Sequence, residues 1–480
     1  MSEPDTLDDA QPASPSAANP AWGRGLFVAG VAGVAGLQVY FLSSAEVRDP
    51  LHLPIGLAIL FLATLPGLLW AKRGRASLPV FEILMLTTAN AYALPLLNGH
   101  QELIFYIPED VTAAGWAVLA YQVAAIAVYE LTSGRPSTHP FWRDDVITGD
   151  MGKWLTYGMA LNTAFVIAST FFDVIPHQIF SVLRAVFFGI GIICTFICSR
   201  RLGQGELSAG ERTFFFANVL LQCVGMISTL FVVGAVSLLL LAFVGYVSSS
   251  GRVPVVMCGC TLLLVATLHH GKAEMRALYW QDERRTPALS ELPDFFTQWL
   301  RFGTDFSTDD ETSGKATSKL IERTSLFHIM CLVVSVTPAQ QPFMSGETYK
   351  DIPYQFVPRL LWPDKPLGHV STSKLSVYYG LQTEEDTEKT TIGFGMVTEA
   401  YANFGFYGVI VVGALLGFVI KKLKKWSEDS PLFSYGGLVV VLFLAWSFQT
   451  EFTLSIWLAS LYQACLAVLL VPFTLRRIFG

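Results

Sequence analysis

A proline-rich segment at residues 358–366 carries charged side chains that are suited to binding an anion. Its sequence is Pro-Arg-Leu-Leu-Trp-Pro-Asp-Lys-Pro, and the prolines fix the backbone angle φ and favour a shaped loop over a helix. Arg359 can hold a phosphate through two parallel hydrogen bonds, and Lys365 adds a second cation. Trp362 can stack on a sugar ring. We expect this loop to bind a phosphorylated ligand; a structural salt bridge between Arg359 and Asp364 is the alternative.

A second group of polar side chains lies at residues 393–405, immediately before an apolar stretch. On a helix, Glu399 and Asn403 are four residues apart and can share one face. A carboxylate at this position can act as a general base toward a sugar hydroxyl. We expect a catalytic role for Glu399 and substrate contacts from Tyr401 and Asn403, with helix capping as the alternative explanation.

Three further cations are candidates for binding a phosphorylated group. Lys272 and Arg276 are four residues apart, so a helix presents both on one face. Such a pair can hold a diphosphate, or it can reach toward the phosphates of lipid headgroups. Arg323 lies in an otherwise apolar segment, where a charge is costly unless it is paired or hydrated, and this makes it a functional candidate.

Residues 342–349 predict a tight turn, because Ser-Gly pairs favour turns. The turn carries Glu347 and Tyr349, which we interpret as candidate substrate contacts. Turn formation alone would also explain the sequence of this segment.

The composition indicates that these residues belong to a membrane protein. Hydrophobic residues make up 52% of the chain and charged residues 15%, with a mean hydropathy of +0.48, whereas a soluble domain has about 25% charged residues. The apolar runs are continuous rather than alternating, which favours membrane helices over a β-barrel. About twelve segments satisfy the ~20-residue criterion for a span. They are residues 26–44, 52–71, 78–97, 112–132, 152–172, 179–198, 213–230, 231–249, 253–270, 404–420, 432–449 and 454–473.

One apolar stretch, between Arg212 and Arg252, has no charged residue and is too long for a single crossing. We therefore expect two helices joined by a tight turn near Gly234. Short loops rich in Lys and Arg, such as Lys421–Lys425, indicate the cytoplasmic side. This rule predicts cytoplasmic termini and an outer position for residues 271–403.

Four regions are expected along the chain. Residues 1–21 resemble a disordered cytoplasmic tail, 22–270 contain the N-terminal transmembrane helices, 271–403 form a large outer loop, and 404–480 contain the C-terminal transmembrane helices. Within the loop, residues 320–337 predict an interfacial or re-entrant helix, because they are apolar but include charged side chains.

No motif in the sequence indicates a metal or another cofactor. The seven cysteines lack metal-ligand spacing, and the chain contains no P-loop, GxGxxG, HExxH or Asp-x-Asp motif. We expect no metal and no cofactor. A lipid-diphosphate donor fits this pattern, since arginine and lysine can stabilise its leaving group.

The order and spacing of these groups resemble the Wzy-type polymerases, which are the O-antigen and exopolysaccharide repeat-unit polymerases of bacterial inner membranes. The matching features, which cover about residues 320–420, are Arg323, Thr337-Pro338, 346–349, 358–366 and 399–405. The resemblance implies an all-α polytopic fold that is GT-C-like, with a large periplasmic loop. It also implies transfer of a growing glycan from undecaprenyl diphosphate to the non-reducing end of a lipid-linked repeat unit. By likeness, Arg323 and Arg359 carry the donor diphosphate or sugar, and Glu399 lies in the acceptor region.

The expected partners are an undecaprenyl-diphosphate-linked oligosaccharide, membrane lipid, and a chain-length regulator and flippase of the same pathway, with no nucleic acid. Two other functions fit the sequence. A transporter or flippase of lipid-linked saccharides should show internal repeats and charges at the membrane midplane. A glycan ligase would share the fold and the donor but use another acceptor.

Overall fold

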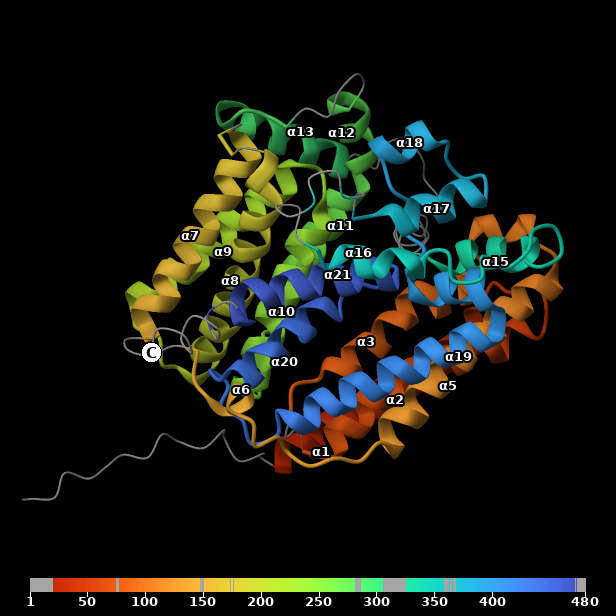
Figure 1. Cartoon of the computed structure of the whole chain (residues 1–480), viewed down its shortest axis with the longest axis horizontal. Helices are drawn as coiled ribbons and strands as arrows, with labels where there is room; N and C mark the ends of the chain where they lie inside the picture. Colours follow the sequence, from red (N-terminus) through yellow and green to blue (C-terminus); the bar gives the residue numbers. More distant parts are fainter. Residues whose placement is uncertain are drawn as a thin grey trace, which may run out of the picture.

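The computed structural model describes residues 20–74, 77–146, 151–172, 174–175, 177–280, 286–304, 325–357, 362, 365, 368–470 and 472. Over these residues the secondary structure is helical, and no strand is formed beyond an isolated bridge between Asp145 and Ser434 (Figure 1). The predicted tail lies outside these residues except for Pro20 and Ala21, which begin the first helix.

The first group of helices is joined through α5, which packs against α2 on one side and along the long helix α19 on another. The group comprises α1 (Pro20–Ser44), α2 (His52–Lys72), α3 (Val80–Thr88), α4 (Leu94–Leu97), α5 (Pro108–Leu131) and α19 (Gly395–Trp426). A π-helical turn, η1 (Ala89–Ala93), joins α3 to α4. Helices α5 and α19 approach closely because Gly413 and Gly417 present no side chain, and a Cβ at either position would collide with a carbonyl oxygen of α5.

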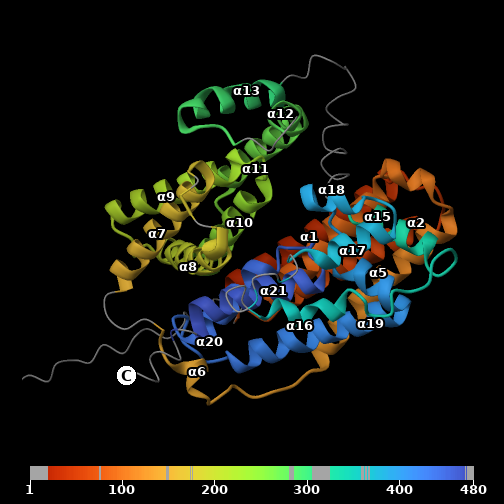
Figure 2. The same ribbon diagram turned by 45° about the horizontal axis from the view of Figure 1, so that its top comes forward.

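The second group consists of α7 (Met151–Phe171), α8 (His177–Gln204), α9 (Ala209–Ser228) and α10 (Val232–Ser250). The long uncharged stretch is divided as predicted, but the turn falls at Thr229–Phe231, slightly before Gly234. Leu230 has φ of 60° there, so the helix cannot continue through it. Figures 1 and 2 show α20 (Tyr435–Trp446) and α21 (Leu454–Cys465) between the two groups, and α21 continues into a π-helical turn, η5 (Leu466–Leu470).

The predicted outer loop contains several short helices rather than irregular chain. It follows α11 (Val255–His270) and consists of α12 (Lys272–Tyr279), η3 (Leu289–Glu291), α13 (Leu292–Thr304), α15 (Phe327–Val336), η4 (Tyr349–Asp351), α16 (Ile352–Gln355), α17 (Val370–Tyr378) and α18 (Glu384–Lys389). Helix α15 has 10 residues, which is about 15 Å and half the thickness of a hydrocarbon core. Its apolar side chains are buried against α5 and α19, so α15 is an internal helix of the protein, and the predicted interfacial or re-entrant position stays a prediction.

Seven helices among the described residues are long and apolar enough to cross a membrane, or eight if α11 and α12, which meet at 48°, form one span. The chain is therefore an all-helical polytopic membrane protein. The count of twelve spans stays a prediction, because α20 and α21 are shorter than the length criterion.

The basic ends of several helices lie together. Arg73 after α2 pairs with Glu130 of α5 at 2.7 Å, and Lys424 of α19 pairs with Glu82 of α3 at 3.0 Å. Both cations belong to basic clusters that the charge rule assigns to the cytoplasm. The opposite ends of α2, α5 and α19 therefore share the other side of the protein, where the outer region begins.

Candidate functional site

Helix α19 is broken at Gly405, and the break creates the platform of the candidate site. Gly405 has φ of 61° and ψ of −145°, which a residue with a side chain rarely adopts. The segment 395–404 is thereby separated in direction from the apolar part of α19. This short helical segment carries Glu399, Tyr401 and Asn403.

The predicted turn at residues 342–349 is formed and docks on this segment. Ser345 and Gly346 have φ of 52° and 88°, and the turn is closed by a hydrogen bond from the backbone N–H of Glu347 to the Met344 carbonyl, 3.0 Å. The Met344 N–H donates to the carbonyl of Ala402 at 3.0 Å. A loop segment of the outer region is thus attached directly to the helix that carries Glu399.

Asn403 ties the turn to the helix through its side-chain amide. Its Oδ1 accepts a hydrogen bond from the Gly346 N–H at 3.0 Å, and its Nδ2 donates to Thr348 Oγ1 and to the Glu399 carbonyl, both at 2.8 Å. The Asn403 side chain is fully buried. In this arrangement Asn403 holds the site together, which is a positioning role rather than the direct substrate contact that the sequence suggested.

Glu399 is the central group of the site. Its side chain is completely buried, and its Oε2 accepts a hydrogen bond of 2.6 Å from the backbone N–H of Leu454, the first residue of α21. The N-terminus of a helix favours a carboxylate. The other oxygen, Oε1, is buried and forms no hydrogen bond of good geometry with the described residues, although the Thr348 hydroxyl lies near the carboxylate. Buried polar atoms without partners are rare, and each one calls for an explanation such as a catalytic role or a bound ligand.

Tyr349 shares the buried surroundings of Glu399. Its hydroxyl is also buried without a hydrogen-bond partner in the described part of the chain, and its ring stacks on Phe404 with centroids 6.1 Å apart. Burial raises the pKa of Tyr349, and the nearby Glu399 carboxylate raises it further. Tyr349 is therefore neutral at physiological pH and can donate a hydrogen bond.

Charged side chains form a rim around these buried groups. Lys374 of α17 lies 2.8 Å from Asp351 Oδ2 and 3.5 Å from Glu347 Oε1. Lys350 also pairs with Glu347, and the hydrogen bond from Lys350 lowers the pKa of that carboxyl group. Glu347 is half-exposed and remains ionised near neutral pH, so it is a poor general base, and it is suited to fixing the two lysines at the rim.

The proline-rich loop is described only in part. Arg359 and Asp364 lie outside the described residues. Trp362 is exposed and meets Tyr354 edge to face, with centroids 5.8 Å apart, so it remains accessible to a ligand. Lys365 is buried instead, and its Nζ donates to the carbonyls of Gln355 at 2.9 Å and Val357 at 3.0 Å.

Lys365 therefore holds the chain just after α16, because it donates to carbonyls at the end of that helix. This role differs from the predicted ligand contact. Arg323, the other predicted donor-binding cation, also lies outside the described residues.

Lys272 and Arg276 are on α12 as predicted, but they have different surroundings. The Arg276 guanidinium lies 4.3 Å from the ring centroid of Trp280 and donates to the Leu230 carbonyl at 3.2 Å. Arg276 therefore stabilises the turn between α9 and α10 by this hydrogen bond. Lys272 is within electrostatic reach of Glu451, whose carbonyl accepts a hydrogen bond from the N–H of Gly395 at 3.0 Å. Lys272 therefore lies closer than Arg276 to the start of α19.

Several residues of the site had no signal in the sequence. Thr348, Asp351 and Lys374 are residue types that are common on protein surfaces, and only their positions in space connect them to Glu399.

Tyr92 belongs to the π-helical turn η1, and such turns are frequent at functional sites. Its hydroxyl is buried near the Thr398 hydroxyl and lies 3.2 Å from the place that a Cβ atom on Gly395 would occupy. The described residues contain no group of three or more His, Cys, Asp or Glu side chains that could hold a metal ion.

Comparison with known proteins gives a family without an assigned activity. The chain belongs to the family described as a domain of unknown function, DUF8712, whose model matches residues 159–452. The match includes Glu399, Asn403 and the docked turn. No curated protein and no solved structure matches the chain.

Proposed function

We propose that this chain is a glycosyltransferase that polymerises undecaprenyl-diphosphate-linked oligosaccharide repeat units into a surface polysaccharide. The observation that carries the proposal is the Glu399 carboxylate, which is buried, has one oxygen that forms no hydrogen bond of good geometry with the described residues, and lies beneath a lysine-bearing rim. The likeness to Wzy-type polymerases in the order of the surrounding motifs supports the same function. The protein would act at the periplasmic face of a bacterial inner membrane, with a GT-C-like arrangement of its helices.

In the proposed reaction, a hydroxyl oxygen of the incoming repeat unit attacks the anomeric carbon of the growing glycan. The bond from that carbon to the diphosphate breaks, and undecaprenyl diphosphate leaves. Glu399 accepts the proton of the attacking hydroxyl as a general base. Arg359 and Arg323 would neutralise the diphosphate, which is the role that the family resemblance assigns to them.

Access to the carboxylate requires the docked turn to move. Glu399 is fully buried, and residues 344–348 cover the segment that carries it through hydrogen bonds to Ala402 and Asn403. The hydrogen bonds between the turn and this segment are few, so a bound substrate could replace them. Binding of the lipid-linked acceptor would displace the turn, so that catalysis and substrate binding are coupled.

A deletion strain tests this function directly. Without the gene, the source bacterium should accumulate lipid-linked single repeat units and lose long surface polysaccharide, and the wild-type gene should restore the polymer ladder on a gel. Purified protein supplied with lipid-linked repeats from that strain should lengthen them and release undecaprenyl diphosphate. A deletion strain that retains its ladder would exclude a polymerase.

The same experiment separates the alternative functions. Single units that stay on the cytoplasmic side would indicate a transporter, because a flippase moves the lipid-linked unit without lengthening it. A normal ladder that stays on the lipid carrier would indicate a ligase.

A further inference from the structure

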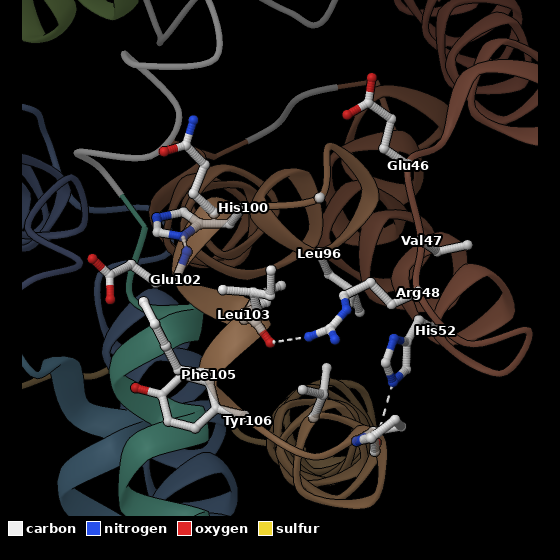
Figure 3. Close-up of a pocket in the computed structure, with 15 residues that line it drawn as sticks. Glu46, Val47, Arg48, His52, Leu96, His100, Glu102, Leu103, Phe105 and Tyr106 are labelled. Carbon is white, nitrogen blue, oxygen red and sulfur yellow. Dashed lines mark hydrogen bonds between the residues drawn. The ribbon is translucent and has the colours of Figure 1, made fainter.

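A cavity of about 610 Å³ lies at the ends of α1, α2 and α5 opposite to their basic ends (Figure 3). Its wall is formed by residues 46–52, which join α1 to α2, and by residues 96–111, which join α4 to α5. The volume is within the range of small-molecule sites. The proposed polymerase chemistry uses none of the residues that line it.

A single arginine supplies the positive charge of this cavity. Arg48 is exposed, and its Nη1 donates to the carbonyl of Leu103 at 2.9 Å, which is its one hydrogen bond to the described residues. A guanidinium has five N–H donors, so most of them stay available to a ligand. In Figure 3 the Arg48 side chain reaches into the space between Leu103 and His52. This geometry suits a phosphate oxygen.

Two carboxylates line the same cavity without neutralising Arg48. Glu46 and Glu102 are both exposed, and within the described ranges neither forms an ion pair with the arginine. Figure 3 shows Glu46 above Arg48 and Glu102 beyond Leu103, with both carboxylates directed away from the arginine. The cavity thus offers a cation in its middle and anions at its edge, which is complementary to a ligand with a phosphate and a separate positive group.

Large apolar side chains are exposed beside the cavity. Leu51, Ile104, Phe105 and Ile107 are exposed by 58%, 63%, 78% and 59% of their surfaces. Leu51 and Ile107 directly precede α2 and α5, which are long and apolar enough to cross a membrane, and Ile104 and Phe105 lie in the short 3-10 turn just before α5. Exposed apolar side chains at such a boundary fit contact with lipid rather than with water.

We propose that this cavity binds a phospholipid with a zwitterionic headgroup. The phosphate is held by Arg48, the ammonium group lies toward Glu46 or Glu102, and the acyl chains follow the exposed apolar side chains. One arginine between two carboxylates selects against a purely anionic headgroup. The inference is independent of the proposed polymerase activity.

Native mass spectrometry of the purified protein, titrated with phosphatidylethanolamine or with phosphatidylglycerol, tests this site. The wild-type protein should bind phosphatidylethanolamine more tightly at its first lipid site. Arg48→Gln should weaken that binding about tenfold or more, the loss expected for a charge-assisted hydrogen bond. The control, Arg135→Gln, removes an exposed arginine at the basic end and should leave lipid binding unchanged.

The carboxylates and the acyl chains are tested in the same assay. The double variant Glu46→Gln with Glu102→Gln should lose the preference for phosphatidylethanolamine over phosphatidylglycerol but still bind lipid. Equal affinity of the wild-type protein for the two lipids would overturn the proposal, as would identical behaviour of Arg48→Gln and Arg135→Gln. Displacement of the lipid by excess inorganic phosphate would identify a free-phosphate site and exclude a lipid site.

Discussion

Replacing Glu399 by Gln removes the carboxylate while changing the shape of the side chain very little. The amide oxygen can still accept the hydrogen bond from the Leu454 N–H, which is 2.6 Å long, so the contact with the start of α21 is kept. The amide NH2 replaces the oxygen that forms no hydrogen bond of good geometry with the described residues, and a buried donor without an acceptor costs about 1–3 kcal/mol. The folded state should therefore be weakened moderately and should still form.

The effect of Glu399→Gln on the reaction should be larger than its effect on stability. Loss of a general base slows a reaction by about 10²–10⁴-fold, or roughly 3–5 kcal/mol of transition-state stabilisation. The rate is measured as undecaprenyl diphosphate released from lipid-linked repeats by purified protein, and stability as the midpoint of thermal unfolding in the same detergent. Glu347→Gln is the matched control, because it makes the same chemical change at a half-exposed carboxylate of the rim. Its rate should stay close to that of the wild-type protein.

Three results would refute the reasoning. A folded Glu399→Gln variant that polymerises at the wild-type rate would show that the carboxylate takes no part in proton transfer. Equal rate losses in Glu399→Gln and Glu347→Gln would show that the charge of the whole rim matters rather than the buried group. Loss of activity that parallels unfolding would assign Glu399 a structural role at the junction with α21.

Three other predictions concern topology, a buried ion pair and pH. In a background with serine in place of the native cysteines, Glu384→Cys should react with an impermeant thiol reagent in intact spheroplasts and Glu428→Cys only after lysis; the reverse would contradict an outer site. Lys424→Met should lower the free energy of unfolding by roughly 3–5 kcal/mol, because it leaves the buried Glu82 without its cation, and adding Glu82→Leu should recover part of the loss in denaturant unfolding. Burial, with a smaller effect of a neighbouring histidine, lowers the pKa of His328 from 6.5 to about 4. Between pH 6.5 and about 4 the unfolded state therefore binds more protons than the folded state, so acidification over this range should reduce the free energy of unfolding by roughly 1 kcal/mol per pH unit. The variant His328→Gln should show a weaker dependence of stability on pH.

Much of the helical architecture could be predicted because hydropathy acts locally. The division of the stretch between Arg212 and Arg252 follows from its length alone, since a single helix would exceed the bilayer. The turn position could not be found in the same way, because the residue that breaks the helix is Leu230 and not Gly234. A leucine with positive φ is stabilised by its packing against the rest of the protein, which no local pattern records.

The candidate site was predictable in its helix but not in its contacts. The four-residue spacing of Glu399 and Asn403 predicts a shared face, and Asn403 Nδ2 donates to the Glu399 carbonyl across one turn. The partner of the carboxylate, Leu454, is 55 residues further along the chain and has no polar side chain that could signal the contact. Lys365 and Arg276 donate to backbone carbonyls, and the sequence does not indicate this because a cation near aromatic residues can bind either a ligand or a carbonyl. Their ligand contacts stay predictions.

Gly405 explains how one helix can serve both the membrane and the site. Beyond the break, Gly413 and Gly417 fix α19 against α5 by close backbone contact, so that part is rigid. Before the break, the segment is tied to the outer turn through Asn403 and to α21 through Glu399. Without Gly405 the direction of this segment would follow the packing of the membrane helices. The break lets the site take its own orientation, and the carboxylate is then set by contacts from the outer region and from α21 together.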